Sequence, residues 1–168
     1  MKASIKVLAG IAICISLASS FLLLSGPNLA LLFATEVTFE EIDWGGMSSA
    51  YESRANLTIR NARNWNDLWL EIHGGDFPIP ETPVVNFTSE MVIAVFQGYC
   101  GSGGYSTNIT KIVMTDSYYL VYVNELHPGE GCITTTVITH PYHIVKITGY
   151  PLNLPVEFIY DILVYDCE

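Results

Sequence analysis

The stretch that decides the fold is Met91-Val-Ile-Ala-Val-Phe-Gln-Gly-Tyr-Cys-Gly-Ser-Gly-Gly-Tyr-Ser-Thr-Asn-Ile-Thr-Lys-Ile-Val-Met114. Its first part, from Met91 to Phe96, is apolar throughout and rich in β-branched residues, which predicts a central strand covered on both faces. Four glycines then fall within seven positions, a density typical of a corner with positive φ angles or of close backbone approach. The alternation of side chains restarts at Tyr105, so a second strand is expected as far as Met114.

Short β-prone segments lie on both sides of this stretch. One helix is expected, with Asn64 as its N-cap and Gly74-Gly75 as its end. The pattern predicts a mainly β fold, an antiparallel β-sandwich or open barrel with one short helix, after an N-terminal hydrophobic leader. The further strands are expected at residues 35–44, 48–60, 118–125, 133–139, 142–148 and 156–165.

Residues 1–34 form the predicted leader. Lys2 and Lys6 precede a long apolar run from Val7 to Leu24, which is long enough to span a bilayer. The run is longer than the core of an ordinary signal peptide and has no clean cleavage site, so an uncleaved N-terminal transmembrane anchor is favoured over a cleaved signal peptide. Residues 35–168 are then expected to form a single extracytoplasmic domain.

The charge of the chain excludes several kinds of partner. The 168 residues carry a formal net charge of −10, and two of the seven basic residues, Lys2 and Lys6, belong to the leader. Such an acidic body does not suit binding to nucleic acid or to anionic lipid. Contact with a membrane is therefore expected through the N-terminal segment only.

Three cysteines lie beyond the leader, and the expected order of strands indicates how they pair. If each strand reverses the direction of the last, the loops with Cys100 and Cys132 lie at one pole and Cys167 lies near the other. We therefore predict a Cys100–Cys132 disulfide, in keeping with an oxidising compartment, and an unpaired Cys167.

Three segments match the acceptor pattern for N-linked glycosylation. They begin at Asn56, Asn86 and Asn108, each followed two residues later by Thr. Three matches in an exported domain of this size predict a glycoprotein.

The histidines are the candidate ligands for a metal site. His140 and His143 could meet Glu125 or Glu130, but Pro141 interrupts the local strand, and the pair has neither strand nor helical ligand spacing. We therefore predict no metal site and no cofactor.

Cys100 is the candidate nucleophile for covalent catalysis. A pair of Cys100 with His127 or His140 competes with the predicted disulfide. We therefore predict no catalytic residue and no enzyme.

What remains is a binding surface at the pole with the two glycine-bearing loops. Tyrosines on such loops are large, amphipathic and common on recognition surfaces. The alternative is that Tyr105 belongs to the core and the glycines only make the corner. The predicted partner-binding residues are Tyr99, Gly103, Gly104, Tyr105, Gly129 and Gly131.

Several segments together resemble the PrcB family of protease-complex subunits, over about residues 47 to 148. The chain differs at Asn86, where an acidic residue is expected before Phe, and it adds Cys100 and Cys132 and has a long leader without a lipobox. The segments that carry the resemblance are Asn64-Trp65-Asn66-Asp67-Leu68-Trp69, Val85-Asn86-Phe87, Phe96-Gln-Gly, Gly103-Gly104-Tyr105-Ser-Thr-Asn-Ile109 and His140-Pro141-Tyr142-His143-Ile144-Val145.

The resemblance implies a β-rich, non-catalytic exported domain that associates with a cell-surface serine protease as an accessory subunit. Two alternatives stay open. The Gly-Gly-Tyr loop also looks like a loop of chagasin-type cysteine protease inhibitors, which predicts a protease inhibitor. The segment 35–44 could instead donate a strand to a neighbouring copy, which predicts a self-assembling surface protein.

Overall fold

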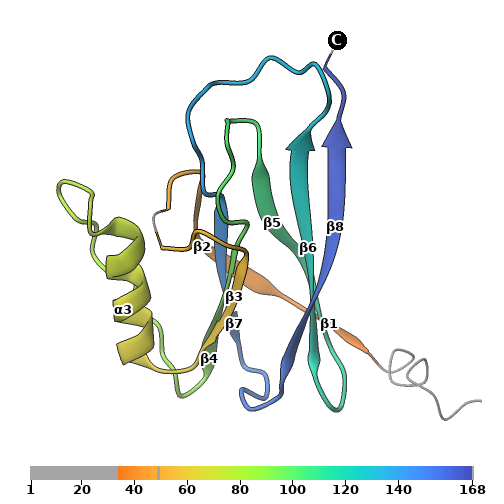
Figure 1. Ribbon diagram of the computed structural model, residues 1–168. Helices are drawn as coiled ribbons and strands as arrows, with labels where there is room; N and C mark the ends of the chain where they lie inside the picture. Colours follow the sequence, from red (N-terminus) through yellow and green to blue (C-terminus); the bar gives the residue numbers. More distant parts are fainter. Residues whose placement is uncertain (1–33, 49, 168) are drawn as a thin grey trace, which may run out of the picture.

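The computed structural model describes residues 34–48 and 50–167, and all but one residue of the predicted leader lie outside this part. Within it, no helix is long and apolar enough to cross a membrane. One helix and eight strands follow one another along these residues (Figure 1). They are β1 (Thr35–Val37), β2 (Phe39–Gly45), β3 (Ala55–Ile59), α3 (Ala62–His73), β4 (Glu90–Phe96), β5 (Ser106–Met114), β6 (Tyr119–Pro128), β7 (Tyr142–Thr148) and β8 (Val156–Tyr165).

The strands form two four-stranded sheets that pack as a sandwich. One sheet has the order β1-β5-β6-β8 and the other has the order β2-β7-β4-β3. The predicted mainly β fold with one short helix is therefore confirmed. The expected single strand 35–44 is divided between the sheets, because the chain crosses from β1 to β2 between Val37 and Phe39.

Strand β4 is buried on both faces, as its apolar sequence predicted. Met91, Ile93 and Val95 face the other sheet, where they pack with Ile112, Val121 and other residues of β5 and β6. The alternate residues of β4 pack under α3 (Figure 1). Because both faces are covered, a polar substitution on either side of β4 would place an unpaired polar group in the core.

Helix α3 covers one sheet with an apolar face of Trp65, Leu68, Trp69 and Ile72. The prediction of Asn64 as N-cap is wrong by one turn. Asn61 has extended backbone angles, and its side-chain oxygen accepts a hydrogen bond of 2.9 Å from the backbone N–H of Asn64. An N-cap side chain satisfies an N–H two or three residues further on, so Asn64 is the recipient of the cap.

The connector after α3 is held by the helix that it covers. The indole N–H of Trp65 donates to the carbonyl of Pro83 at 2.8 Å, and that of Trp69 donates to the carbonyl of Pro80 at 3.0 Å. Buried indole N–H groups need such partners. The proline-rich segment, which cannot be regular structure, is thus fixed against the domain.

The predicted strand at residues 133–139 is absent, and this changes the topology. These residues form part of a long loop between β6 and β7, in which Ile133 is fully exposed. The chain therefore reverses one time fewer than expected, so β8 runs parallel to β6, from Tyr119↔Val156 to Pro128↔Tyr165. Every other strand pair is antiparallel.

A buried ion pair links the two sheets beside β8. Glu125 of β6 is fully buried, and Arg54, just before β3, donates two hydrogen bonds to its carboxylate. The Arg54 guanidinium also lies over the ring of Tyr160 of β8, 4.6 Å from the ring centre. The ion pair raises the pKa of Arg54 and neutralises the Glu125 charge inside the sandwich.

We expect Arg54→Ala to lower the free energy of unfolding by about 3 kcal/mol, because it leaves the Glu125 carboxylate buried without a counter-charge. Arg63→Ala is the matched control, since Arg63 is exposed on α3, and it should change stability by less than about 0.5 kcal/mol. Urea unfolding of both variants measures the difference. Equal losses for the two variants would show that the ion pair does not stabilise the fold.

Candidate functional site

Three loops meet at one end of the sandwich, which we call the loop pole and define as residues 46–48, 50–54, 97–105 and 129–141 (Figure 1). Backbone hydrogen bonds join the loops. The N–H of Tyr99 donates to the carbonyl of Glu52 at 3.0 Å, and the N–H of Cys100 donates to the carbonyl of Thr139 at 2.8 Å. The structure therefore brings the two predicted glycine-bearing loops together and adds the β2–β3 loop to them.

The disulfide at the loop pole joins Cys132 to Cys167, and the predicted Cys100–Cys132 pairing is wrong. The reason is the parallel β8, which returns the chain end to the pole that was expected to lie far from it. In the chain-entropy model, closing a loop of 35 residues stabilises the fold by about 4 kcal/mol.

Cys100 is a free, buried thiol. Its burial, together with the negative charge of Glu125, raises the pKa of the Cys100 thiol. A nucleophilic cysteine needs the opposite shift, so this environment disfavours thiolate chemistry at Cys100.

The predicted site glycines divide into two kinds. Gly103 is packed against Thr135, and a Cβ there would lie 2.3 Å from the Thr135 hydroxyl oxygen. Gly104 has a φ of +89°, and a Cβ there would lie 2.5 Å from the Tyr165 hydroxyl. These glycines permit close contact between loops, whereas Gly131, with a φ of +85°, has open space around it.

Gly129 belongs with the close-packed group, since a Cβ there would lie 2.7 Å from the carbonyl oxygen of Tyr165. Its N–H donates to the same carbonyl at 2.8 Å. Of the six predicted partner-binding residues, Gly103, Gly104 and Gly129 therefore hold the loop pole together from within.

The two predicted tyrosines differ in exposure. Tyr99 is 54% exposed and meets the ring of His140 edge-on, with 5.8 Å between the centres. Tyr105 is half-buried and meets His127 edge-on, with 5.1 Å between the centres. Tyr99 is thus available to a partner at the loop pole, while Tyr105 supports the loop and lines a groove beside it.

Sequence reasoning missed four exposed apolar side chains of the loop pole. The sequence predicts a strand at residues 133–139, in which alternate side chains would face the core. Ile133, Val137 and Ile138 belong to this segment. In the structure Ile133 is 99% exposed, and Val137 and Ile138 are about half exposed. Met47 on the β2–β3 loop is the fourth, and it pairs with His140 through a short backbone bridge.

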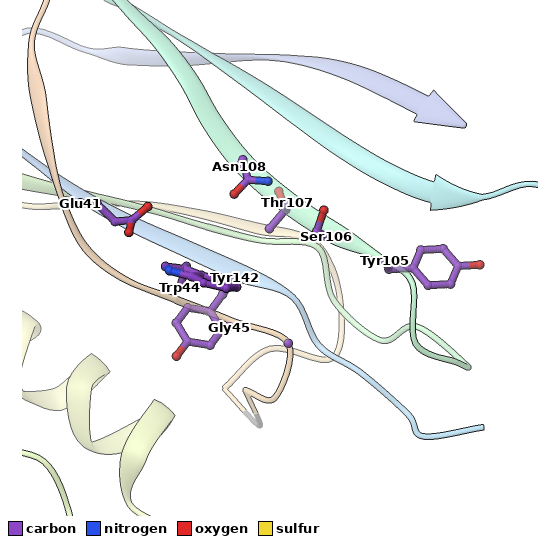
Figure 2. Close-up of a pocket in the computed structure, with 9 residues that line it drawn as sticks. Glu41, Trp44, Gly45, Tyr105, Ser106, Thr107, Asn108 and Tyr142 are labelled. Carbon is purple, nitrogen blue, oxygen red and sulfur yellow. The ribbon is translucent and has the colours of Figure 1, made fainter. Parts of the chain in front are cut away.

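An open groove of about 500 Å³ runs along β5 next to the loop pole (Figure 2). It exists because β1 pairs with β5 only from Ile112 to Met114, so the first half of β5 has no strand on that side. The buried Thr107 hydroxyl in its wall makes no hydrogen bond within the described residues. The lining residues are Glu41, Trp44, Gly45, Gly46, Tyr105, Ser106, Thr107, Asn108 and Tyr142.

His143 lies behind this groove as a neutral, fully bonded imidazole. Its Nδ1 accepts a hydrogen bond of 2.8 Å from the backbone N–H of Ile109, so the proton is on Nε2, which lies 3.0 Å from Glu41. Burial lowers the pKa of His143, although Glu41 opposes this shift. At the β-bulge of β5, the His143 ring thus accepts a backbone hydrogen bond that a neighbouring strand would otherwise accept.

The other histidine of the Pro-Tyr segment, His140, lies 3.7 Å from Glu52 and does not share a partner with His143. Within residues 34–48 and 50–167, no three His, Cys, Asp or Glu side chains are placed to hold a metal ion. The geometry gives His140 and His143, the pair considered and rejected as metal ligands above, no common ligand position.

A second polar network ties α3 to the sheet beneath it. Asp43 accepts a hydrogen bond of 2.8 Å from the Tyr142 hydroxyl and lies 2.9 Å from Nε2 of His73. Burial and the hydrogen bond to Asp43 raise the pKa of Tyr142 far above its usual value. The Tyr142 hydroxyl therefore keeps its proton, so it acts as a structural hydrogen-bond donor and not as a proton-transfer group.

The three predicted glycosylation asparagines are all exposed, which the modification requires. Asn108 lies on β5 at the groove, and Asn86 forms a turn before β4. Asn56 on β3 accepts a hydrogen bond from the Tyr160 hydroxyl across the sheets. Occupancy at these positions stays a prediction.

The fold and the site define a class: a two-sheet β domain with cross-linked loops and exposed apolar side chains at one pole. Residues 91–148 match the sequence model of a family described as PrcB C-terminal. The match runs from β4 to the end of β7, so it includes the central strand and most of the loop pole. It confirms the predicted resemblance to the PrcB family over this segment. No curated protein and no solved structure matches the chain.

We expect Gly104→Ala to destabilise the protein more than Gly131→Ala. Both substitutions place a Cβ at positive φ, which costs about 1–2 kcal/mol. Only Gly104→Ala also drives the Cβ into the Tyr165 hydroxyl and Thr134, so its total loss should be about 3 kcal/mol. Thermal unfolding measures both variants, and equal losses would contradict the close packing of the loop pole.

We expect the free energy of unfolding to fall as the pH drops below about 6.5. The folded chain keeps His143 neutral because its pKa is lowered, while the unfolded chain binds a proton at the ordinary value of 6.5. His143→Asn retains an acceptor for Ile109 and removes this titration. Urea unfolding at pH 7 and pH 5 should show a smaller loss in the variant, and equal losses would exclude His143 as the cause.

Proposed function

We propose that the protein is a non-catalytic, extracytoplasmic binding module that serves as an accessory subunit of a cell-surface protease complex. Its contact surface is the loop pole. The residues that meet the partner are Tyr99, Met47, Ile133, Val137 and Ile138, with Gly131 giving the loop its turn.

The observation that carries this proposal is the gathering of exposed apolar side chains on loops that are held in place. Ile133 is 99% exposed and Tyr99 is 54% exposed, yet backbone hydrogen bonds join the loops, and the Cys132–Cys167 disulfide ties one loop to the segment after β8. Exposed apolar side chains gathered on one face mark interaction surfaces. Loops that are already ordered lose less entropy when a partner binds.

The PrcB match supports the kind of partner. It covers the loop that holds Tyr99 and the loop that holds Ile133, Val137 and Ile138. The proposal that the partner is a protease subunit rests on this family match alone. The extracytoplasmic location rests on the leader and on the disulfide, which is typical of oxidising compartments.

Two observations disfavour the alternatives. The Gly-Gly-Tyr loop is packed against Thr134, Thr135 and Tyr165, so it does not project as an inhibitory loop would need to. The segment 35–44 already pairs with β5 and β7 within the chain, so it is not a spare strand for a neighbouring copy.

Affinity capture tests the proposal, with the full-length chain as bait against membrane and secreted fractions of its own host. We expect a serine protease to be recovered in stoichiometric amount and to be lost with the double variant Ile133→Asp/Val137→Asp. Recovery of no protease, with the bait folded, would overturn the proposal.

The matched control is Val84→Asp/Ile79→Asp, which places the same charges on exposed apolar residues of the proline-rich connector. It should leave capture unchanged. Equal loss in both double variants would show that net charge, and not the loop pole, decides binding. An activity assay on the recovered pair then separates an accessory subunit from an inhibitor, because only the inhibitor blocks proteolysis.

A further inference from the structure

Strand β8 ends its sheet with an edge that no other described strand covers. It has ten residues, Val156–Tyr165, and pairs only with β6. The edge that faces away from β6 presents a row of backbone N–H and C=O groups, which is a template for a further strand. Figure 1 shows β8 as the outermost strand of the sandwich, opposite the side covered by α3.

This edge lacks most of the features with which proteins usually protect a terminal strand, and its only charges are the carboxylates of Glu157 and Asp161. Protected edge strands are short, carry charged residues (Lys above all) or Pro, or are interrupted by a bulge. The sequence of β8, Val-Glu-Phe-Ile-Tyr-Asp-Ile-Leu-Val-Tyr, contains neither Lys nor Pro. Its register with β6 is continuous over all ten residues, so no bulge bends it away.

The exposed side chains of β8 are mainly aliphatic. Ile159 and Leu163 lie on the outer face of the sheet and are 43% and 40% exposed. Ile162 and Val164 lie on the inner face, beyond the start of β3, and are 52% and 63% exposed. Parallel strands are normally covered on both faces. The four exposed aliphatic residues of β8 lack this cover.

The charge on this edge is negative only. Glu157 and Asp161 are exposed on the outer face of β8, and neither β6 nor β8 contains a Lys or Arg. The nearby Arg54 is already bound to Glu125. Pairing of β8 with β8 of a second copy would bring like charges together without a counter-charge, and like charges across a strand pair are destabilising.

We propose that the open edge of β8 binds an extended strand of a partner protein, with Lys or Arg side chains on the outer face and aliphatic side chains on the inner face. The partner's backbone continues the sheet beyond β8, which is strand addition at an edge. Its basic residues pair with Glu157 and Asp161, and its aliphatic residues cover Ile162 and Val164. The inference deepens the proposed function by naming a second surface, separate from the loop pole, and the chemistry that it takes.

The test uses the full-length protein in mild detergent and a fluorescent synthetic peptide of alternating Lys and Val or Ile residues. Fluorescence anisotropy measures affinity, and hydrogen-exchange mass spectrometry reports protection of residues 156–165. We expect saturable binding with protection confined to β8 and its neighbour. A peptide with Glu in place of Lys, and one with N-methyl groups on alternate backbone nitrogens, should each bind at least about tenfold more weakly.

Two charge variants locate the site. Glu157→Lys/Asp161→Lys should weaken binding of the Lys peptide by about tenfold or more. Asp67→Lys/Glu81→Lys makes the same change of net charge at exposed positions on α3 and on the proline-rich connector, and it should leave binding unchanged. Equal weakening by both variants, or binding without protection of β8, would overturn the proposal in favour of general charge attraction.

Sedimentation velocity without peptide tests whether the edge of β8 instead pairs with β8 of a second copy of the chain. A dimer that protects residues 156–165 and is dissociated by Asp161→Lys would overturn the proposal, and a monomer is the expected result. The peptide assay needs no protease, and its variants leave the loop pole intact. Loss of protease capture with retained peptide binding would therefore reject the loop pole alone, and the reverse result would reject the edge alone.

Discussion

Burial of β4 on both faces is the constraint on which the rest of the structure depends. Residues Met91 to Val95 have no exposed surface, so one face requires the β5–β6–β8 sheet and the other requires α3. The helix in turn fixes the proline-rich connector through its two tryptophans. The glycine corner after β4 then delivers the chain to the opposite sheet and places the loop pole at the end where β4 stops.

The fold class was predictable because its signals are local. The apolar run of β4, the helical spacing of Trp65 to Ile72 and the alternation in β8 each depend on a few neighbouring residues. The disulfide was not predictable, because it depends on a count of chain reversals. One misassigned segment, residues 133–139, moved Cys167 to the wrong pole; its β-branched residues suit a strand but find no partner strand.

The meeting of the two glycine-bearing loops was predictable, but the roles of their residues were not. Crowded glycines indicated loops that the structure brings together, because positive φ angles and close packing favour glycine wherever loops meet. The roles of individual residues were not accessible, since whether Gly103 is exposed or packed is decided by Thr135, far away in sequence. The exposure of Ile133 and the uncovered edge of β8 likewise depend on how distant segments pack, so the local sequence does not reveal them.

The position of β1 gives the domain a further property, that of a spacer. Thr35, the first residue of β1, pairs with Met114 at the end of β5 that lies farthest from the loop pole. The nine residues of β5 span about 30 Å between these two ends. A partner seated on the loop pole therefore stands a full domain length from the point where the chain enters, whatever that end of the chain is attached to.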